Sequence, residues 1–223
     1  MIMIDLFSGT KSMSNAFKKA GWQTLSVDND ATTCPDLGSD IHLLTAKEGK
    51  ALTYKIPTPF DHPDVLWASP PCTCFSVASM GHHWKQPYGT PRTQEAIDSI
   101  QLVLATQRLI CELKPKYWFI ENPRGMLRKL AIMQGMKRHT ITYCQYGDNR
   151  MKPTDIWTNH PNPCFKPPCK NGMTCHERAP RGSKTGTQGL KNARERGRIP
   201  QAFCEHIQRI CQTDDIHNTM TPR

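Results

Sequence analysis

A cysteine that directly follows two prolines is the strongest candidate for a nucleophile in this chain of 223 residues. The stretch Ser69-Pro70-Pro71-Cys72-Thr73-Cys74-Phe75-Ser76 comes after the apolar run Val65-Leu66-Trp67-Ala68, which predicts a buried strand. Proline fixes the backbone angle φ, so the pair presents the next side chain at a defined angle. A cysteine held in this way can attack an electrophilic carbon if its thiolate form is favoured. The alternative for Cys72 is a buried structural cysteine in a tight turn.

A carboxyl group after another predicted strand supplies the proton chemistry that such a thiolate needs. Glu121-Asn122-Pro123 follows the run Tyr117-Trp118-Phe119-Ile120, and a carboxyl group partly removed from water can hold a proton near neutral pH. When a thiolate adds to carbon 6 of cytosine and an acid protonates ring nitrogen 3, carbon 5 becomes a nucleophile that can accept a methyl group. The alternative for Glu121 is an acid that stabilises the amino end of a helix through the helix dipole.

Alternating strands and helices are needed to bring these residues together. Strand-like runs cover residues 1–7, 23–27, 65–68, 117–120, 140–146 and 154–158, and helical patterns cover 12–20, 93–113 and 201–211. This alternation predicts an α/β protein with a doubly wound sheet. Ligands of such sheets bind at the carboxyl ends of the strands. The polar motifs all lie at such ends: residues 5–10, Asp28, residues 69–76 and residues 121–123.

Four motifs, in this order along the chain, resemble those of the cytosine-5 DNA methyltransferase family. They are Asp5-Leu6-Phe7-Ser8-Gly9-Thr10, Pro71-Cys72-x-x-Phe75-Ser76, Glu121-Asn122-Pro123 and Tyr146-Gly147-x-x-Arg150-x-Lys152. The resemblance covers about residues 1–159 and a helix near 198–211, and it indicates a compact, phage-type member. It implies a Rossmann-like, S-adenosylmethionine-dependent enzyme that methylates carbon 5 of cytosine in DNA through a covalent Cys72 adduct and base flipping.

The resemblance assigns the catalytic residues one by one. Cys72, rather than Cys74, matches the family nucleophile, because Phe75-Ser76 fixes the register of the motif. Glu121 matches the residue that contacts ring nitrogen 3. Arg150 and Lys152 match an Arg-x-Arg pair that orients the base and the carboxylate, with lysine in the second place.

The resemblance also implies a set of residues around S-adenosylmethionine. Asp28 would bind the ribose hydroxyls, the alternative being a solvated acid at a strand end, and Asp40 with Ile41 would hold the adenine. The whole expected set is Asp5, Phe7, Ser8, Gly9, Thr10, Lys11, Asp28, Asn29, Asp40, Ile41, Ser69 and Pro70.

Two departures from the family pattern lie near this expected cofactor site. Gly9-Thr10-Lys11-Ser12 stands where the family has Gly-x-Gly-Gly, so negative φ is expected at the two positions that are no longer glycine. Lys11 could then meet the methionyl carboxylate. Gly197-Arg198-Ile199-Pro200 replaces the family's Asn-x-Val-Pro, and the added basic charge raises the hypothesis of an acid-bearing donor related to S-adenosylmethionine.

Basic charge is concentrated near the carboxyl end of the chain. The formal net charge is +10, and the stretch from Lys166 to Arg198 holds nine basic side chains and two glutamates. Such a segment favours a polyphosphate partner, with a solvated basic loop as the alternative. The aromatic and basic loop 77–92 is expected to close over a flipped base, unless its tryptophan is tucked against the sheet. The expected nucleic-acid contacts are Ser76, Trp84, Lys85, Arg92, Arg178, Arg181 and Lys184.

A Cys/His-rich stretch divides the chain into three expected parts: a catalytic domain over 1–159, a short basic target-recognition segment over 160–197, and a helix in 198–223 that packs back on the catalytic domain. The middle part holds Cys164, Cys169, Cys175 and His176, preceded by His160. Four soft ligands can close a tetrahedral zinc site and order a segment that lacks its own core. The spacing is not that of a standard zinc knuckle, so zinc and a metal-free loop both stay open.

Composition narrows the remaining choices. No apolar stretch suits a membrane span and no signal peptide opens the chain, so a cytoplasmic protein with reduced cysteines is expected, in the host cytoplasm if a phage encodes it. We expect a monomer that acts on double-stranded DNA. RNA or a free cytosine nucleotide is the alternative substrate, although one nucleotide hardly needs so many cations. The other alternative is a catalytically silent nucleic-acid-binding module, which the presence of both Cys72 and Glu121 disfavours.

Overall fold

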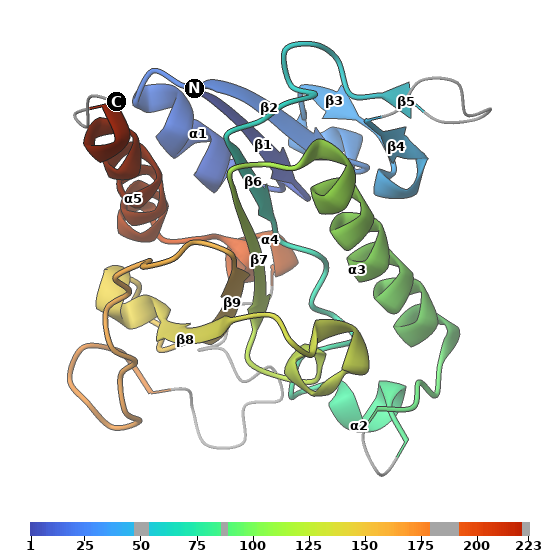
Figure 1. The fold of residues 1–223 in the computed structure, drawn as a ribbon. Helices are drawn as coiled ribbons and strands as arrows, with labels where there is room; N and C mark the ends of the chain where they lie inside the picture. The colour runs from blue at the N-terminus through green and yellow to red at the C-terminus, as the bar shows by residue number, and fades with distance from the viewer. Residues whose placement is uncertain (47–53, 86–88, 179–191, 220–223) are drawn as a thin grey trace.

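The computed structural model describes residues 1–46, 54–85, 89–178 and 192–219. A seven-stranded sheet runs through its centre (Figure 1). In spatial order its strands are β3 (Leu37–Gly38), β2 (Gln23–Asp28), β1 (Ile2–Leu6), β6 (Val65–Ala68), β7 (Tyr117–Pro123), β9 (Pro153–Thr158) and β8 (Arg138–Thr142). A separate pair joins β4 (Leu44–Thr45) to β5 (Tyr54–Lys55).

The order of the strands creates a crevice between β1 and β6. Strands β3, β2, β1, β6 and β7 are parallel, whereas β9 is antiparallel to both β7 and β8. The chain passes outward from β1 to β2 and β3 and then returns to β6 on the other side of β1. Loops that leave neighbouring parallel strands in opposite directions leave a ligand crevice at their carboxyl ends. Leu6 pairs with both Val27 and Ala68, so three such loops begin at the same level.

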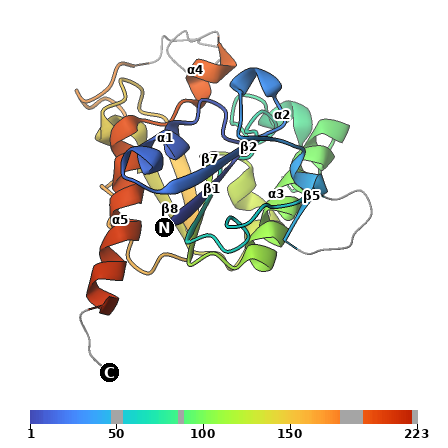
Figure 2. The same cartoon turned by 90° about the horizontal axis from the view of Figure 1, so that it is seen from above.

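Helices cover both faces of the sheet (Figures 1 and 2). Alternate residues of a strand point to opposite faces, and β1 shows the result. Met3 packs in one core cluster with residues of α1 (Ser12–Lys19) and α5 (Gln201–Thr219), whereas Ile4 packs in another with residues of α3 (Gln94–Leu113). The doubly wound α/β fold expected from the sequence is therefore confirmed.

The elements agree with the sequence pattern except where tertiary pairing changes them. Strand β7 continues through Pro123 because its last residues pair with β9, so Glu121 and Asn122 lie within a strand rather than after one. The run expected over 140–146 stops at Thr142 and becomes a 3-10 turn over Tyr143–Tyr146, which ends at Gly147 with φ of 85°.

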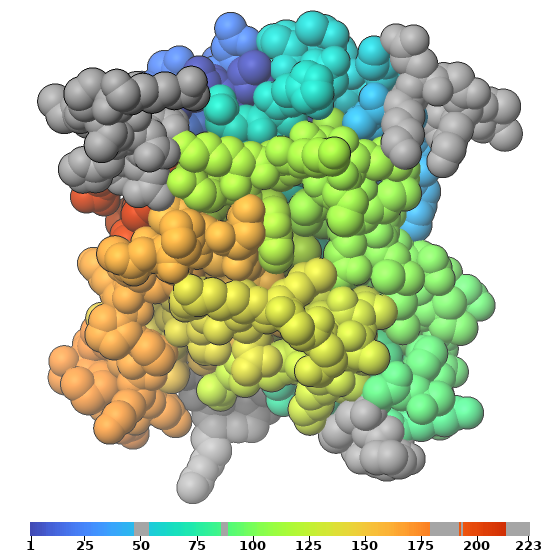
Figure 3. All heavy atoms as spheres, viewed as in Figure 1, coloured from blue at the N-terminus to red at the C-terminus, as the bar shows by residue number. Residues whose placement is uncertain are grey.

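Several features outside the main sheet had no clear sequence signal. Short helices form at α2 (Met80–His83) and α4 (Ala193–Gly197). Residues 160–178 contain no helix or strand and lie on the surface beside the β8 region (Figure 3). Within the residues that the structure describes, no helix has the length and apolar character needed to cross a membrane.

Candidate active site

The loop that carries Cys72 is tied to the neighbouring strand. It leaves β6 next to β1, where the Ser69 amide donates to the Leu6 carbonyl at 3.2 Å. The Cys72 carbonyl then accepts from the amides of Phe75 and Ser76 at 3.0 and 2.9 Å, which closes a turn. From β7, the side-chain amide of the fully buried Asn122 donates to the Pro70 carbonyl at 2.9 Å. Asn122 therefore fixes the Cys72 loop to the strand that carries Glu121.

A glycine allows a second attachment between the same two segments. The Met126 amide donates to the Phe75 carbonyl at 2.7 Å, which draws the loop after β7 onto the Cys72 loop. At Gly125 a β-carbon would lie 2.1 Å from the Phe75 carbonyl oxygen, far inside any normal contact. Only glycine fits this close approach of two backbones.

The position of Trp84 corrects one expectation. We expected this side chain to contact nucleic acid, but it is only 2% exposed. Its ring stacks on Phe75 with centroids 6.0 Å apart, and its indole N–H donates to the Cys74 carbonyl at 2.8 Å. Burial of a large aromatic surface together with a satisfied N–H stabilises a fold. Trp84 therefore stabilises the Cys72 loop through Phe75 and Cys74.

Cys72, Glu121 and Lys152 line one cavity of about 220 Å³, together with Phe7 and Pro71. Cys72 is partly exposed, whereas Cys74 is buried outside this lining. The cavity lies at the carboxyl ends of β1, β6 and β7, where the strand order predicts a ligand crevice. Two residues that sequence reasoning did not assign, Arg194 and Gly197 of α4, complete its wall.

Glu121 is held by a hydrogen bond that the sequence did not indicate. The hydroxyl group of the fully buried Tyr143 donates to Glu121 Oε1 at 2.9 Å. Lys152 lies over the same tyrosine, with Nζ 4.5 Å from the ring centroid. Burial raises the pKa of Glu121, against the opposing effects of the Lys152 charge and the Tyr143 hydrogen bond. The site therefore makes the proton of the Glu121 carboxyl group harder to lose than it is in water.

The electrostatics of Cys72 depend on that proton. Burial and, next, the negative charge of Glu121 raise the pKa of Cys72, whereas the positive charge of Lys152 opposes both. Protonation of Glu121 removes its repulsive charge and leaves the opposing positive charges of Lys152 and Arg196. A neutral Glu121 therefore disfavours the thiolate less than an ionised one does, although burial still raises the pKa of Cys72.

Lys152 and Arg150 occupy different places although they belong to one motif. Lys152 Nζ donates to the Arg196 carbonyl at 2.9 Å while lining the cavity, and burial lowers its pKa. Arg150 is absent from the residues that line this cavity. Its guanidinium binds the Asp148 carboxylate through Nε at 2.8 Å and Nη2 at 2.5 Å. It also donates to the carbonyl of Glu195 at 3.4 Å. The structure brings only Lys152 of the expected pair to Cys72 and Glu121.

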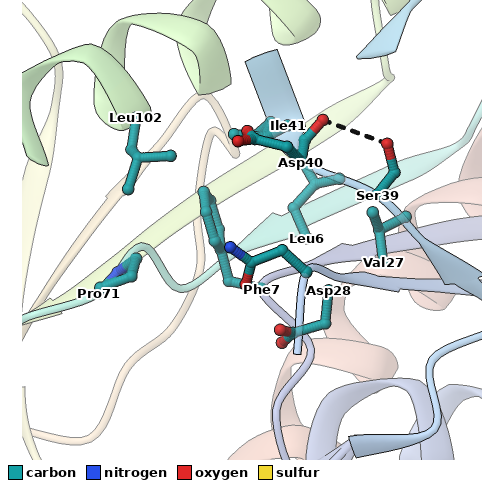
Figure 4. A pocket seen from close by; sticks show the side chains of 10 residues that line it. Leu6, Phe7, Val27, Asp28, Ser39, Asp40, Ile41, Pro71 and Leu102 are labelled. Atoms are coloured by element: carbon teal, nitrogen blue, oxygen red, sulfur yellow. Dashed lines mark hydrogen bonds between the residues drawn. The ribbon is translucent and has the colours of Figure 1, made fainter. Parts of the chain in front are cut away.

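A second, smaller cavity of about 40 Å³ adjoins the first and shares Phe7 and Pro71 with it. Figure 4 shows its lining side chains, which come from the ends of β1 and β2, residues 39–41, Pro71 and α3. Asp28 lies in the wall, with one carboxylate oxygen accepting from the Gly9 amide at 2.8 Å. Five expected cofactor contacts gather here: Phe7, Asp28, Asn29, Asp40 and Ile41.

The other expected cofactor residues are divided between the first cavity and the core. Gly9, Thr10, Ser69 and Pro70 line the Cys72 cavity. Asp5, Ser8 and Lys11 line neither cavity. Asp5 is buried and accepts from the Ser14 amide at 3.0 Å, and its burial raises its pKa to about 7. It therefore anchors the start of α1.

The conformation of Lys11 differs from the one expected. Its φ is +56°, in the left-handed region, where a negative value had been expected. Lys11 precedes α1 and its amide donates to the Ser8 carbonyl at 2.7 Å, which tightens the turn between β1 and the helix. Its ammonium group donates to the Cys34 carbonyl. The turn therefore places a lysine in a left-handed conformation that favours glycine.

Four sulfur and nitrogen ligand atoms gather beside the turn that follows β8. They belong to Cys144, Cys169, Cys175 and His176 and all lie within 4.8 Å of one another. Cys164, which we expected among the ligands, is exposed and stands outside this group. Its replacement by Cys144 arises because residues 160–178 fold back on the 3-10 turn Tyr143–Tyr146, a contact that spacing along the chain does not reveal.

The expected nucleic-acid contacts other than Trp84 are at or near the surface where they are described. Lys85, Arg92 and Arg178 are exposed, and Ser76 is half-buried with its hydroxyl 2.9 Å from that of Ser79. Arg181 and Lys184 lie outside the described residues.

Comparisons with known proteins identify the family of this chain. The model of the C-5 cytosine-specific DNA methylase family matches residues 1–138. A protein of Frog virus 3 named "Probable DNA (cytosine-5)-methyltransferase" is 28% identical over 95% of this chain and 100% of its own length. Type II methyltransferase M.AplI of Arthrospira platensis is 30% identical over 58% of this chain, which spans only 33% of that protein. The solved structure of the Entamoeba histolytica methyltransferase EhMeth covers 79% of this chain and 56% of its own, with 14% identity and a TM-score of 0.47.

The family match spans well over half of the chain and includes the residues that form both cavities from β1 to β7. The antiparallel β9, the Cys/His group and α5 fall outside it. On this evidence the chain belongs to the C-5 cytosine-specific DNA methylase family.

Proposed function

We propose that this protein transfers a methyl group from S-adenosylmethionine to carbon 5 of cytosine in DNA. The observation that carries the proposal is the shared cavity of Cys72, Glu121 and Lys152 next to the smaller cavity of Phe7 and Asp28. The residues that we assign as nucleophile and proton donor therefore lie beside a recess lined by Phe7 and Asp28, at one switch point of the sheet.

Cys72 and Glu121 divide the chemistry of cytosine activation. Cys72 forms a carbon–sulfur bond to carbon 6 while Glu121 gives its proton to ring nitrogen 3, and the displaced electron pair makes carbon 5 nucleophilic. Carbon 5 would then take the methyl group, with S-adenosylhomocysteine as the leaving group. Water would accept the proton of carbon 5 as the carbon–sulfur bond breaks and the Cys72 thiolate departs, and the proton of nitrogen 3 returns to Glu121. Lys152 keeps a positive charge beside both groups and favours the thiolate.

S-adenosylmethionine supplies the electrophilic methyl group. The smaller cavity fits the nucleoside part of this cofactor in its chemistry, because the Asp28 carboxylate can accept from ribose hydroxyls while Phe7 and Ile41 offer apolar surface. The same Phe7 borders the Cys72 cavity, which lets one residue contact both cofactor and base.

The DNA partner is supported by charge. The chain carries a formal net charge of +10, and Lys85, Arg92 and Arg178 are exposed. Neutralising phosphates with such groups gives affinity with a strong dependence on salt. A target base enters the cavity only after it leaves the double helix. We propose that a single chain acts on double-stranded DNA in this way, and that it reads few bases because its recognition segment is short.

The direct test is transfer of labelled methyl groups from S-adenosylmethionine to double-stranded DNA, single-stranded DNA, RNA or dCTP. The proposal requires product on double-stranded DNA that is identified as 5-methylcytosine, and product confined to RNA or dCTP would replace the assigned substrate. Cys72→Ser should abolish transfer, whereas Cys74→Ala should retain it because Cys74 lies outside the cavity lining. Activity in Cys72→Ser with none in Cys74→Ala would reverse the assignment of the nucleophile.

A further inference from the structure

Three separate parts of the chain meet in one group of soft ligands. Cys144 comes from the 3-10 turn after β8, Cys169 from the middle of residues 160–178, and Cys175 with His176 from its end. Cys144 is buried, Cys169 and His176 are half-buried, and Cys175 is exposed. All ten cysteines are free thiols, so no disulfide accounts for the gathering.

The distances within the group suit a tetrahedral metal ion. His176 Nδ1 lies 3.7 Å from Cys169 Sγ and 3.6 Å from Cys175 Sγ. Zinc bonds of about 2.3 Å to sulfur and about 2.0 Å to nitrogen place such atoms about 3.6 Å apart in a tetrahedron. Cys169 Sγ and Cys175 Sγ are 3.2 Å apart, too far for a sulfur–sulfur bond of about 2.0 Å. A central ion needs them only about 0.6 Å farther apart.

The segment that carries three of these ligands is held by separate contacts, among them Phe165 packed against the core and the Lys166 amide, which donates to the Tyr146 hydroxyl at 2.9 Å. Residues 160–178 form no helix or strand. The middle and end of this segment meet the catalytic part of the chain through isolated hydrogen bonds, from the Cys169 amide to Thr142 Oγ1 at 2.8 Å and from the Glu177 amide to the Asn149 carbonyl at 2.8 Å. A metal ion that binds four ligands supplies folding free energy to such a segment directly.

We propose that Cys144, Cys169, Cys175 and His176 bind one structural zinc ion, which clamps residues 160–178 onto the turn after β8. Three sulfur ligands and one imidazole nitrogen form a closed site of the kind that structural zinc occupies. The inference goes beyond the proposed methyl transfer, since the site contains no residue of either cavity.

The clamp lies next to the residues that hold the active site. Cys144 directly follows Tyr143, whose hydroxyl donates to Glu121. At the other end of the clamp, Glu177 directly follows His176 and pairs with Arg150 in a β-bridge. Zinc therefore holds both the turn that contains Tyr143 and, through the bridge to Arg150, the segment that continues to Lys152. It also fixes the described first part of the basic stretch from Lys166 to Arg198, which ends at Arg178.

The test is the metal content of the full chain, measured by mass spectrometry of the purified protein. Wild-type protein is expected to bind about one zinc ion per chain, and Cys144→Ser and Cys169→Ser are expected to lose it. The matched control is Cys164→Ser, which removes an exposed cysteine of the same segment that stands outside the group and should keep the zinc. Chelation of wild-type protein should lower its melting temperature.

A second measurement uses only wild-type protein, so it tests the proposal even if the cysteine variants fail to fold. Cobalt(II) bound to chelated wild-type protein should give the intense visible bands of a tetrahedral site and the near-ultraviolet bands of thiolate ligands. The proposal is overturned if wild-type protein grown with zinc holds none, or if mass spectrometry finds a disulfide between Cys169 and Cys175. It is also overturned if Cys164→Ser loses as much zinc as Cys144→Ser. None of these outcomes depends on methyl transfer, so failure here is separate from failure of the proposed function.

Discussion

The residues of the Cys72 cavity are positioned by the sheet, whereas those of the Cys/His group are positioned by an irregular segment. This difference explains why only the first site could be predicted from the sequence. Cys72 follows β6, and Glu121 lies in β7, the neighbouring parallel strand, so the order of the sheet brings them close together. The ligands of the Cys/His group come from a turn and from a segment without regular structure. Their meeting depends on how that segment folds back, which no short pattern records. Motifs at the ends of sheet strands predict which residues come together, whereas motifs in irregular segments predict only which residue types are available.

The largest effect is expected from Glu121→Gln, which should reduce methyl transfer in the Cys72 cavity and leave the Cys/His group unchanged. Glutamine keeps an acceptor for the Tyr143 hydroxyl but has no proton to give to ring nitrogen 3, so methyl transfer should fall by about 10²- to 10⁴-fold. Because ionised Glu121 raises the pKa of Cys72, Cys72 of the variant should also be alkylated faster at pH values above the pKa of Glu121, where the wild-type carboxyl group is charged. Zinc content should not change. Methyl transfer, alkylation against pH and metal analysis of one sample measure all three.

Two results would contradict this account of Glu121. A variant with normal transfer would show that the carboxyl group is not the proton donor. Slower alkylation of Cys72 would show that the charge of Glu121 does not oppose the thiolate.

A large effect on stability is expected at Gly125, where the two loops of the cavity touch. A β-carbon there collides with the Phe75 carbonyl oxygen at 2.1 Å, so Gly125→Ala should lower the free energy of unfolding by about 1–3 kcal/mol. Transfer should fall as well, because Phe75 belongs to the Cys72 turn. Gly81→Ala is the matched control, since a β-carbon at Gly81 meets no atom within 4 Å. Urea unfolding compares the two variants, and equal stabilities would contradict the described contact.

A moderate shift of the pH–rate profile in one direction is expected from Tyr143→Phe. Tyr143 lies between the two regions, since it contacts Glu121 and directly precedes Cys144. The hydroxyl hydrogen bond lowers the pKa of Glu121, so its loss raises that pKa. Transfer that needs the protonated carboxyl is present below the pKa of Glu121 and is lost as pH rises through it. The alkaline limb of the pH–rate profile should therefore move to higher pH, by about one unit for a bond of about 1.4 kcal/mol. A limb that moves to lower pH would contradict the assigned role.

The smallest effect is expected from Trp84→Phe. This variant tests whether Trp84 stabilises the Cys72 loop or contacts DNA. Phenylalanine keeps the packing on Phe75 but cannot donate to the Cys74 carbonyl, which costs about 1 kcal/mol. The maximal rate should fall a few-fold while the Kd for DNA stays unchanged. Steady-state kinetics and a DNA-binding titration distinguish this from a direct contact, which would weaken binding instead.

Much of the fold and part of the site could be predicted from particular residues. The Phe75-Ser76 register selected Cys72 over Cys74, and only Cys72 lines the cavity. Asp28, Asp40 and Ile41 were expected around one ligand and line one cavity. Cys72 and Asp28 follow predicted strands, whose positions periodicity and topology fix, whereas Asp40 and Ile41 were expected from the family resemblance alone.

The remaining features depend on contacts between distant parts of the chain. Trp84 was expected to contact nucleic acid because its loop follows the nucleophile, yet the alternative of a buried tryptophan holds, since the ring packs on Phe75. Arg150 and Lys152 are two residues apart and face different surroundings because Asp148 binds only the arginine. Tyr143 and Cys144 belonged to a predicted strand, but a 3-10 turn directs one toward Glu121 and the other toward the Cys/His group.

The most direct test of the central claim is a trapping experiment with DNA that contains 5-fluorocytosine. Fluorine at carbon 5 cannot leave as a proton does, so a covalent adduct to carbon 6 persists after methyl transfer. We predict a stable protein–DNA complex that requires S-adenosylmethionine, with the modified base on the peptide of Cys72 and no complex in Cys72→Ser. An adduct on Cys74, or turnover of cytosine DNA without any trapped complex, would contradict the assignment of Cys72 as the nucleophile.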